Sequence, residues 1–309
     1  MKIAIAGASG VIGRRVVLQL IDAGHRVTAL TRPGSRRRAS LPPGCRVAEA
    51  SLFDRAEVTA AIAGHDVAIN LATHIPRSPL AMMFRRAWHE NDRIRTEGAL
   101  NIALAAAKSD VKILVQESFA FAYPSSGADW IDERTPLQPA AYCRSVLSAE
   151  AAAMGFARSD ARAVILRFAP LYGPDASQTG DMVRAVRKGW AVLPGKRTSF
   201  ISSLSHDDAA SAVVAAIGAA TGAYNVSDDC PVTHEEFMSV IADALEVPEP
   251  RFLPAWTAAL MGSAGRTLAR SIRLRNDRLK SATAWTPRFS SVREGLPGAA
   301  IAAGDNPAA

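Results

Sequence analysis

The chain has 309 residues, of which 49% are hydrophobic and 21% charged, as is ordinary for a globular protein of one large domain or of a main domain with a smaller lobe. The net charge of +7 comes mainly from scattered arginines without interleaved aromatic residues, which argues against a nucleic-acid partner. No apolar run reaches the roughly 18 residues of a membrane span, and three isolated cysteines without metal-ligand spacing predict a reduced, cytoplasmic protein with no membrane partner and no metal site.

The first half of the chain alternates short apolar runs with segments of helical periodicity. The apolar runs predict buried strands over residues 2–7, 25–32, 45–50, 66–72, 111–118 and 161–168. Apolar residues at helical spacing predict helices over residues 11–24, 54–64, 95–109 and 142–158. Strands that alternate with helices pair in parallel, so we expect an α/β fold with a doubly wound parallel sheet covered on both faces.

The character of the sequence changes after residue 170. Prolines and glycines become frequent, helical segments shorten, and strand-like runs such as TSFIS and AYNVS stand alone. We therefore expect a main domain over residues 1–170 and a smaller lobe over residues 171–298 that is partly interleaved with it. Residues 299–309 are expected to form a frayed tail.

The segment GASGVIG places Gly7, Gly10 and Gly13 directly after the first strand and at the start of the first helix. In that context the pattern is typical of a turn that binds a dinucleotide. Glycines let backbone N–H groups approach a pyrophosphate, and the helix N-terminus adds a partial positive charge. Gly13 would also allow the helix to pack closely on the strand.

The end of the second strand indicates which dinucleotide is bound. An acidic residue there would accept hydrogen bonds from the adenosine ribose, but this strand ends at Thr31 and Arg32 and is followed by Arg36, Arg37 and Arg38. Arginine pairs with a 2′-phosphate through charge-assisted hydrogen bonds. We therefore predict NADP as the cofactor and regard NAD as less favoured; the alternative is a solvated basic loop.

Several further segments, in their order and spacing, resemble one family. NLAT (70–73), Asn91 followed by GALN (98–101), LRFAPLYGP (166–174) and AWTPRFSSVREGL (284–296) resemble motifs of the extended or atypical short-chain dehydrogenases/reductases, the NAD-dependent epimerase/dehydratase group. Asp54 stands where that family keeps an aspartate near adenine.

The resemblance runs along nearly the whole chain and implies a Rossmann-type sheet, a small C-terminal substrate lobe and a small-molecule substrate. Family members often pair through helices that correspond to residues 81–107 and 142–158, so a homodimer is an expectation as well. The matched segments and the basic loop together give the predicted cofactor site: Gly7, Ser9, Gly10, Val11, Ile12, Gly13, Arg32, Arg36, Asp54, Leu71, Ala72, Thr73, Asn91, Ser118, Tyr142 and Pro170.

The family's active site combines a serine or threonine, a tyrosine, and a lysine four residues after the tyrosine. In AYCRSV the tyrosine is Tyr142, but Val146 stands in the place of the lysine. The family's spacing puts the serine position on Phe119, with Ser118 one residue earlier. Without the lysine, we expect the pKa of Tyr142 to stay near its ordinary value, so that the phenol donates a proton instead of acting as a base.

Two other side chains are candidates for chemistry. Glu117 ends the fifth predicted strand, where open parallel sheets bind ligands, and His74 follows the fourth, although a histidine there is also typical of a surface loop. We expect an NADPH-dependent reductase of a carbonyl-type group in a small polar metabolite, with Tyr142, Ser118 and Glu117 as catalytic residues. The alternative is a non-redox protein, either an epimerase, dehydratase or cyclase or an NADP-binding regulator, that keeps the nucleotide without the usual triad chemistry.

Overall fold

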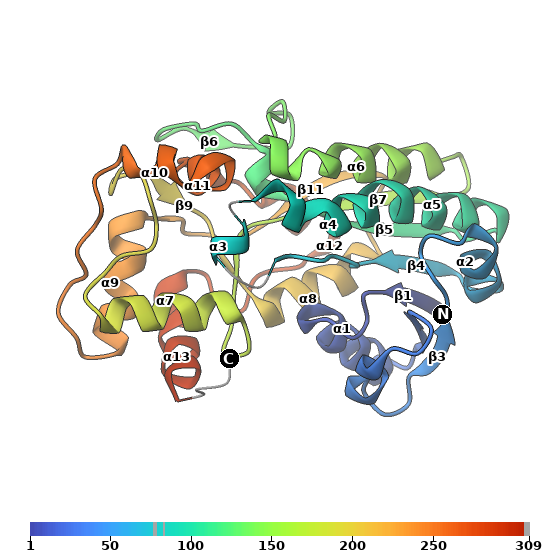
Figure 1. The fold of residues 1–309 in the computed structure, drawn as a ribbon. Coiled ribbons are helices and arrows are strands. Elements are labelled where there is room, and N and C mark those ends of the chain that lie inside the picture. The colour runs from blue at the N-terminus through green and yellow to red at the C-terminus, as the bar shows by residue number, and fades with distance from the viewer. Residues whose placement is uncertain (77–78, 83, 306–309) are drawn as a thin grey trace.

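The computed structural model describes residues 1–76, 79–82 and 84–305 and has a seven-stranded sheet at its centre (Figure 1). The strands lie in the order β11-β7-β5-β4-β1-β2-β3, and every neighbouring pair is parallel. The predicted doubly wound parallel sheet is confirmed. The bounds of its strands are β1 Lys2–Ala6, β2 Arg26–Thr31, β3 Arg46–Glu49, β4 Val67–Asn70, β5 Ile113–Phe119, β7 Arg162–Phe168 and β11 Gly222–Val226.

The direction in which strands are added reverses between β1 and β4. In doubly wound sheets, ligands bind outside the carboxyl ends of the strands at such a switch point. Ile5 of β1 pairs with Ala29 of β2 on one side and with Ile69 of β4 on the other. This register brings the ends of β1 and β4 together beside the glycine turn.

Helices cover both faces of the sheet, as Figure 1 shows. Alternate residues of β1 face opposite ways: Ile5 joins the core around Leu20, and Ala4 joins the core around Ile102. Both cores are apolar, as expected for a parallel sheet buried on two sides. On one face lie α1 Val11–Asp22, α8 His206–Ala216 and α12 Asp277–Thr283; on the other lie α2 Arg55–Ile62, α5 Ala99–Lys108 and α6 Ser145–Phe156.

The long connection from β4 to α5 consists of short helical pieces. It holds α3 Pro79–Met82, the 3₁₀ segment η2 Arg85–Trp88, α4 His89–Arg93 and the π-helical segment η3 Ile94–Gly98. The single helix predicted over residues 95–109 is thus a π-helical turn followed by α5, which ends at Lys108.

Most of the remaining elements form the C-terminal lobe and the connections to it, whereas η1 lies between β2 and β3. The lobe has its own apolar core, in which Phe237, Ile241 and Leu296 are buried. Its helices are α7 Ser177–Arg187, α9 His234–Ala244, α10 Thr257–Leu260, α11 Gly262–Leu268 and α13 Val292–Gly304. The two-residue strands are β6 Trp130–Ile131, β8 Leu171–Tyr172, β9 Phe200–Ile201, β10 Leu204–Ser205, β12 Val232–Thr233 and β13 Arg273–Leu274, and the other 3₁₀ segments are η1 Arg36–Ser40, η4 Ala120–Ala122 and η5 Ala141–Cys143.

Two expectations about the second half of the chain need correction. The run AYNVS, expected to stand alone, forms β11, the edge strand of the main sheet, so the chain returns to the main sheet after residue 171. The tail expected to fray from residue 299 is helical through Gly304, because Ala300 and Ala303 of α13 are buried against the lobe. Residues 306–309 lie outside the described part of the chain.

Candidate functional site

The glycine turn after β1 is held by backbone contacts that exclude larger residues. Gly7 has φ +83°, and a Cβ atom there would lie 2.6 Å from the carbonyl carbon of Leu71. A Cβ atom at Gly13 would lie 2.2 Å from the Gly7 carbonyl oxygen, whereas at Gly10 the nearest atom would be 3.2 Å away. Because backbone atoms cannot swing aside, a side chain at the first or third glycine would force the turn open. These two glycines bring the turn, α1 and the end of β4 into contact.

Helix α1 begins without a capping side chain. Gly10 is its N-cap residue, and no acidic residue stands in its first turn. The first N–H groups of a helix lack partners within the helix and carry a partial positive charge. Ser9, Val11 and Ile12 surround this helix start and are half-buried. The turn therefore has the donors that a pyrophosphate requires, and a dinucleotide fits the residues present.

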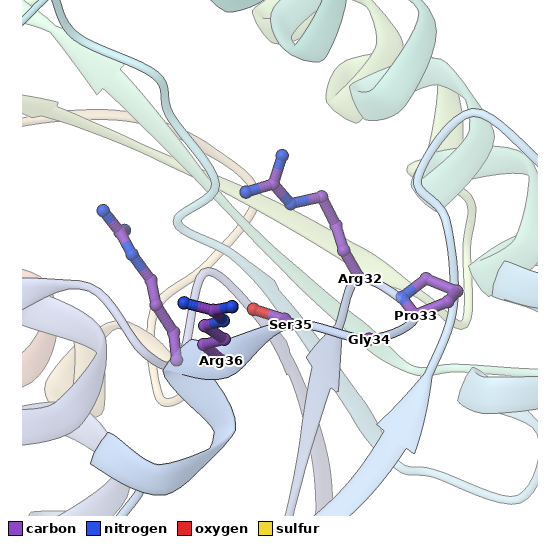
Figure 2. Close-up of a pocket in the computed structure, with 6 residues that line it drawn as sticks. Arg32, Pro33, Gly34, Ser35 and Arg36 are labelled. Atoms are coloured by element: carbon purple, nitrogen blue, oxygen red, sulfur yellow. The ribbon is translucent and has the colours of Figure 1, made fainter.

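A basic pocket of about 390 Å³ opens at the end of β2. Figure 2 shows Arg32 reaching out from the strand end, with Ser35 and Arg36 on the far side of the turn. Both arginines are exposed, and the lining contains no acidic residue. A ligand phosphate would therefore find positive charge and a hydroxyl here, in the position that the sequence predicted. The lining residues are Arg32, Pro33, Gly34, Ser35, Arg36 and Arg37.

The loops after β3 and β4 are shaped by side-chain hydrogen bonds to the backbone. Asp54 caps α2 by accepting from the amides of residues 56 and 57, at 2.8 and 3.1 Å. Asn70 accepts from the Ala72 amide at 3.1 Å, and Asn91 accepts from the His74 amide at 2.9 Å. Asp54 and Asn91 are both predicted cofactor contacts, and in the structure their side chains hold backbone amides of the neighbouring segments in place. Leu71, Ala72 and Thr73 line this loop, with Thr73 and His74 exposed.

The lobe is tied to α1 by a cluster of charged groups around Asp175. This carboxylate accepts from Arg15 at 2.9 Å and lies 3.0 Å from Nδ1 of His206. The hydrogen bond with His206 and the pairing with Arg15 hold the pKa of Asp175 well below its ordinary range. Arg15 also donates to Asp207 at 2.7 Å. Because Pro170 and β8 lead into this segment, the cluster fixes the start of the lobe against the glycine turn.

Tyr142, the predicted proton donor, lies in η5 just before α6. The residue is 6% exposed, and its ring packs on Trp88 with a centroid separation of 4.7 Å. Burial raises the pKa of Tyr142 above its ordinary value, and a hydrogen bond with Thr267 and the charge of Arg270 only partly oppose this. The expectation of a near-ordinary pKa is therefore wrong. The phenol stays protonated throughout the physiological pH range.

Ser118 is built into a buried polar network instead of facing Tyr142. Strand β5 continues through Phe119, so Ser118 points toward α6, where its hydroxyl donates to Glu150. Arg167 donates from Nε and Nη2 to the two carboxylate oxygens of Glu150, at 2.9 and 2.7 Å, and from Nη1 to Tyr123 at 2.8 Å. The hydroxyl of Ser118, the predicted catalytic serine, is therefore bound to the buried ion pair of Glu150 and Arg167. Ser118 and Tyr142 are not brought together.

Glu117 faces Arg95, a residue that sequence reasoning missed. Nη2 of Arg95 donates to Oε1 of Glu117 at 2.6 Å, and the two side chains are 6% and 15% exposed. Burial raises the pKa of Glu117, and the positive charge of Arg95 opposes this. The Arg95 guanidinium also lies over the ring of Phe119, 5.9 Å from its centroid. No sequence pattern indicated a functional role for Arg95, because its partner Glu117 is 22 residues away on another element.

Comparison with known proteins decides the family. The model described as "NAD dependent epimerase/dehydratase family" matches residues 3–227. The chain belongs to this family. A 3-diazoavenalumate denitrifying reductase of Streptomyces sp is 35% identical over 317 residues, which cover 96% of this chain and 99% of the relative. An epimerase family protein of Mycobacterium bovis is 26% identical over 82% of each chain.

Solved structures share the fold of this epimerase/dehydratase family member. A human epimerase family protein, solved with NADPH, superposes with a TM-score of 0.82 at 22% identity and covers 97% of this chain and 99% of its own. The UDP-glucose 4-epimerase of Thermotoga maritima, solved with UDP-glucose, gives 0.81 at 21% identity and covers 98% of both chains. The Rossmann-type sheet with its C-terminal lobe is therefore the family's architecture.

The family resemblance predicts a triad of serine or threonine, tyrosine and lysine, but this chain has no lysine at the third position. Val146 occupies the lysine position on α6 and is completely buried, so the charge of the lysine is missing there. Arg95 and Arg270 supply positive charge near Tyr142 instead. Among the described residues, no group of histidine, cysteine or acidic side chains is arranged to hold a metal ion. Within the same residues, no helix has the length and apolar character to cross a membrane.

Proposed function

We propose that this protein is an NADPH-dependent reductase that replaces a diazo group of a small molecule with hydrogen. The observation that carries the proposal is the likeness, along 96% of the chain, to a reductase whose name specifies a diazo compound and denitrification. The family's sugar-nucleotide epimerases share the fold at 20–22% identity, which is too distant to transfer their substrates.

The nucleotide side of the site supports NADPH as the reductant. The glycine turn and the uncapped start of α1 would hold the pyrophosphate, and Arg32 and Arg36 would pair with the 2′-phosphate. The reduced nicotinamide supplies a hydride when the cofactor is bound. NADH lacks the phosphate that the basic pocket would bind, so it is the poorer reductant in this proposal.

Reductive loss of a diazo group suits a site without a tyrosine–lysine pair. In net terms, the diazonium carbon gains a hydride, and its bond to nitrogen breaks with the electron pair leaving as N₂. The cofactor is oxidised to NADP⁺ and the substrate is reduced by two electrons. No oxygen has to be protonated or deprotonated in this step, so the absence of the lysine at Val146 and the high pKa of Tyr142 are no obstacle.

Carbonyl reduction is the second candidate, because Tyr142 remains a protonated phenol that can donate to a carbonyl oxygen. The two reactions differ in their need for that proton. Loss of a general acid typically slows a reaction by about 10²–10⁴-fold. In Tyr142→Phe, a diazo reductase would keep kcat/KM within about tenfold of the wild type, whereas a carbonyl reductase would lose at least about 100-fold.

The deciding experiment measures NADPH oxidation by the wild type and by Tyr142→Phe with an ortho-hydroxyaryl diazonium salt and with an aryl ketone. A reaction without protein corrects for spontaneous reduction of the diazonium salt. We expect protein-dependent oxidation with the diazonium salt that survives the substitution. Oxidation with the ketone alone, abolished in Tyr142→Phe, would replace this proposal by carbonyl reduction.

A further inference from the structure

The Arg95–Glu117 ion pair leaves hydrogen-bonding capacity unused inside the protein. Only Nη2 of Arg95 and Oε1 of Glu117 are joined. Nε of Arg95 and Oε2 of Glu117 are buried and have no hydrogen-bond partner among the described residues. One donor and one acceptor of the same ion pair are therefore vacant, although buried polar atoms are nearly always paired.

A second buried ion pair in the same protein has no such vacancy. Arg167 and Glu150 are buried to a similar degree, with side chains 10% and 11% exposed. They meet side-on, so that Nε and Nη2 each bind one carboxylate oxygen, and Ser118 adds a further hydrogen bond. The single hydrogen bond of the Arg95 pair is thus a local arrangement, and it leaves free two atoms that a side-on pair would use.

The Arg95 pair lies where ligands bind in a doubly wound sheet. Glu117 is near the carboxyl end of β5, and Arg95 stands in the π-helical segment η3, a rare backbone form that is frequent at functional sites. Aromatic side chains lie near Arg95: its guanidinium lies over the ring of Phe119, and its charge acts on Tyr142, which packs on Trp88. The surroundings therefore favour a flat apolar ligand with one polar group.

We propose that Arg95 and Glu117 bind one hydroxyl group of an aromatic substrate. Nε–H of Arg95 donates to the hydroxyl oxygen, and the hydroxyl in turn donates to Oε2 of Glu117. A carboxylate would accept from Arg95 but face the oxygen of Glu117, and an ammonium group would meet the reverse conflict. A hydroxyl group, whose oxygen both accepts and donates, satisfies both vacant atoms. The location of the substrate rests on the proposed function, whereas the two vacant atoms do not.

The test compares three flat probes with the NADP⁺-saturated protein: 4-hydroxycinnamate, its methyl ether 4-methoxycinnamate, and cinnamate. Isothermal titration calorimetry gives the dissociation constant of each probe. We expect the hydroxyl probe to bind about 100-fold tighter than the other two, because sites built to bind a hydroxyl strongly reject analogues that lack it. If all three bind alike, or none binds, the vacant atoms hold a water molecule only and the inference is overturned.

Variants separate a binding role from a structural one. Glu117→Gln removes the acceptor charge and should reduce the hydroxyl preference to less than about tenfold. The double variant Arg95→Met with Glu117→Gln leaves no uncompensated buried charge and guards against unfolding. Glu97→Gln, which breaks the exposed pair with Arg93 in the same segment, is the matched control and should keep the preference. NADP⁺ affinity should be unchanged in all variants; a preference that survives the double variant would contradict the assignment.

The outcome is separable from that of the proposed function. Hydroxyl-dependent probe binding without any diazo reduction would support the Arg95 pair and refute the reductase. Diazo reduction with no preference for a hydroxyl group would support the reductase and refute the role of the Arg95 pair.

Discussion

The basic pocket at the end of β2 gives a direct prediction about nucleotide selectivity. Arg32→Ala removes one exposed guanidinium from a pocket that also contains Arg36 and Arg37. A hydrogen bond to a charged group contributes about 1.5–3 kcal/mol, and the lower end applies because the pocket is open to solvent. About 1.5 kcal/mol corresponds to a roughly tenfold higher Kd for NADPH. The Kd for NADH should change less than twofold, since NADH has no 2′-phosphate.

The assay is fluorescence titration of wild type, Arg32→Ala and the double variant with Arg36→Ala. If the two contributions add, the double variant should bind NADPH about 100-fold more weakly. Arg46→Ala is the matched control, because Arg46 is exposed on β3 and does not line the pocket. Equal losses for NADPH and NADH, or equal losses in the control, would refute the assignment of the pocket to the phosphate.

Three further predictions concern the framework of the site. Gly13→Ala should weaken NADPH binding and lower the free energy of unfolding by about 1–3 kcal/mol, because its Cβ would lie 2.2 Å from a backbone oxygen. Gly10→Ala, whose Cβ would lie 3.2 Å from the nearest atom, should cause smaller losses of NADPH affinity in titration and of stability in urea unfolding. Glu150→Gln leaves a buried arginine without its countercharge and should cost about 3–5 kcal/mol in urea unfolding, against at most about 1 kcal/mol for Glu97→Gln at an exposed pair; similar losses in both would contradict the network. Burial lowers the pKa of His234 to about 4 in the folded protein. In the unfolded chain the histidine has an ordinary pKa of about 6.5, so between these two pH values only the unfolded chain binds the proton. Stability is therefore lost as the pH falls, and between pH 7 and 5 the wild type should lose about 2 kcal/mol more than His234→Asn; parallel pH profiles would show that the histidine is not excluded from protonation.

The features that the sequence predicted correctly are those with local causes. Strand and helix alternation is visible in apolar periodicity, and the glycine turn needs only three residues whose spacing is fixed by the turn itself. Arg167 and Glu150 occupy neighbouring elements, but neither the pairing nor the capture of Ser118 has any pattern in the sequence. The place of β11 at the sheet edge depends on its register with β7, about 60 residues earlier in the chain.

The chemistry of the site could not be predicted because burial comes from distant segments. The pKa of Tyr142 depends on Trp88 and on α11, which lies more than 100 residues further along the chain. The sequence shows that Val146 replaces the lysine, but the pKa of Tyr142 is set more by burial of the phenol, which the sequence does not show. The ion pair of Arg95 with Glu117 and the unpaired Nε of Arg95 depend on tertiary contacts that no sequence pattern indicates.

The reaction that we propose for this protein is the reduction of a diazo group by NADPH with release of nitrogen. The most direct measurement is the stoichiometry of NADPH oxidised and N₂ released when the protein acts on an ortho-hydroxyaryl diazonium salt, by absorbance and gas analysis of the same reaction. We expect one molecule of N₂ for each NADPH oxidised. Nitrogen release without NADPH oxidation, or NADPH oxidation without nitrogen release, would contradict it.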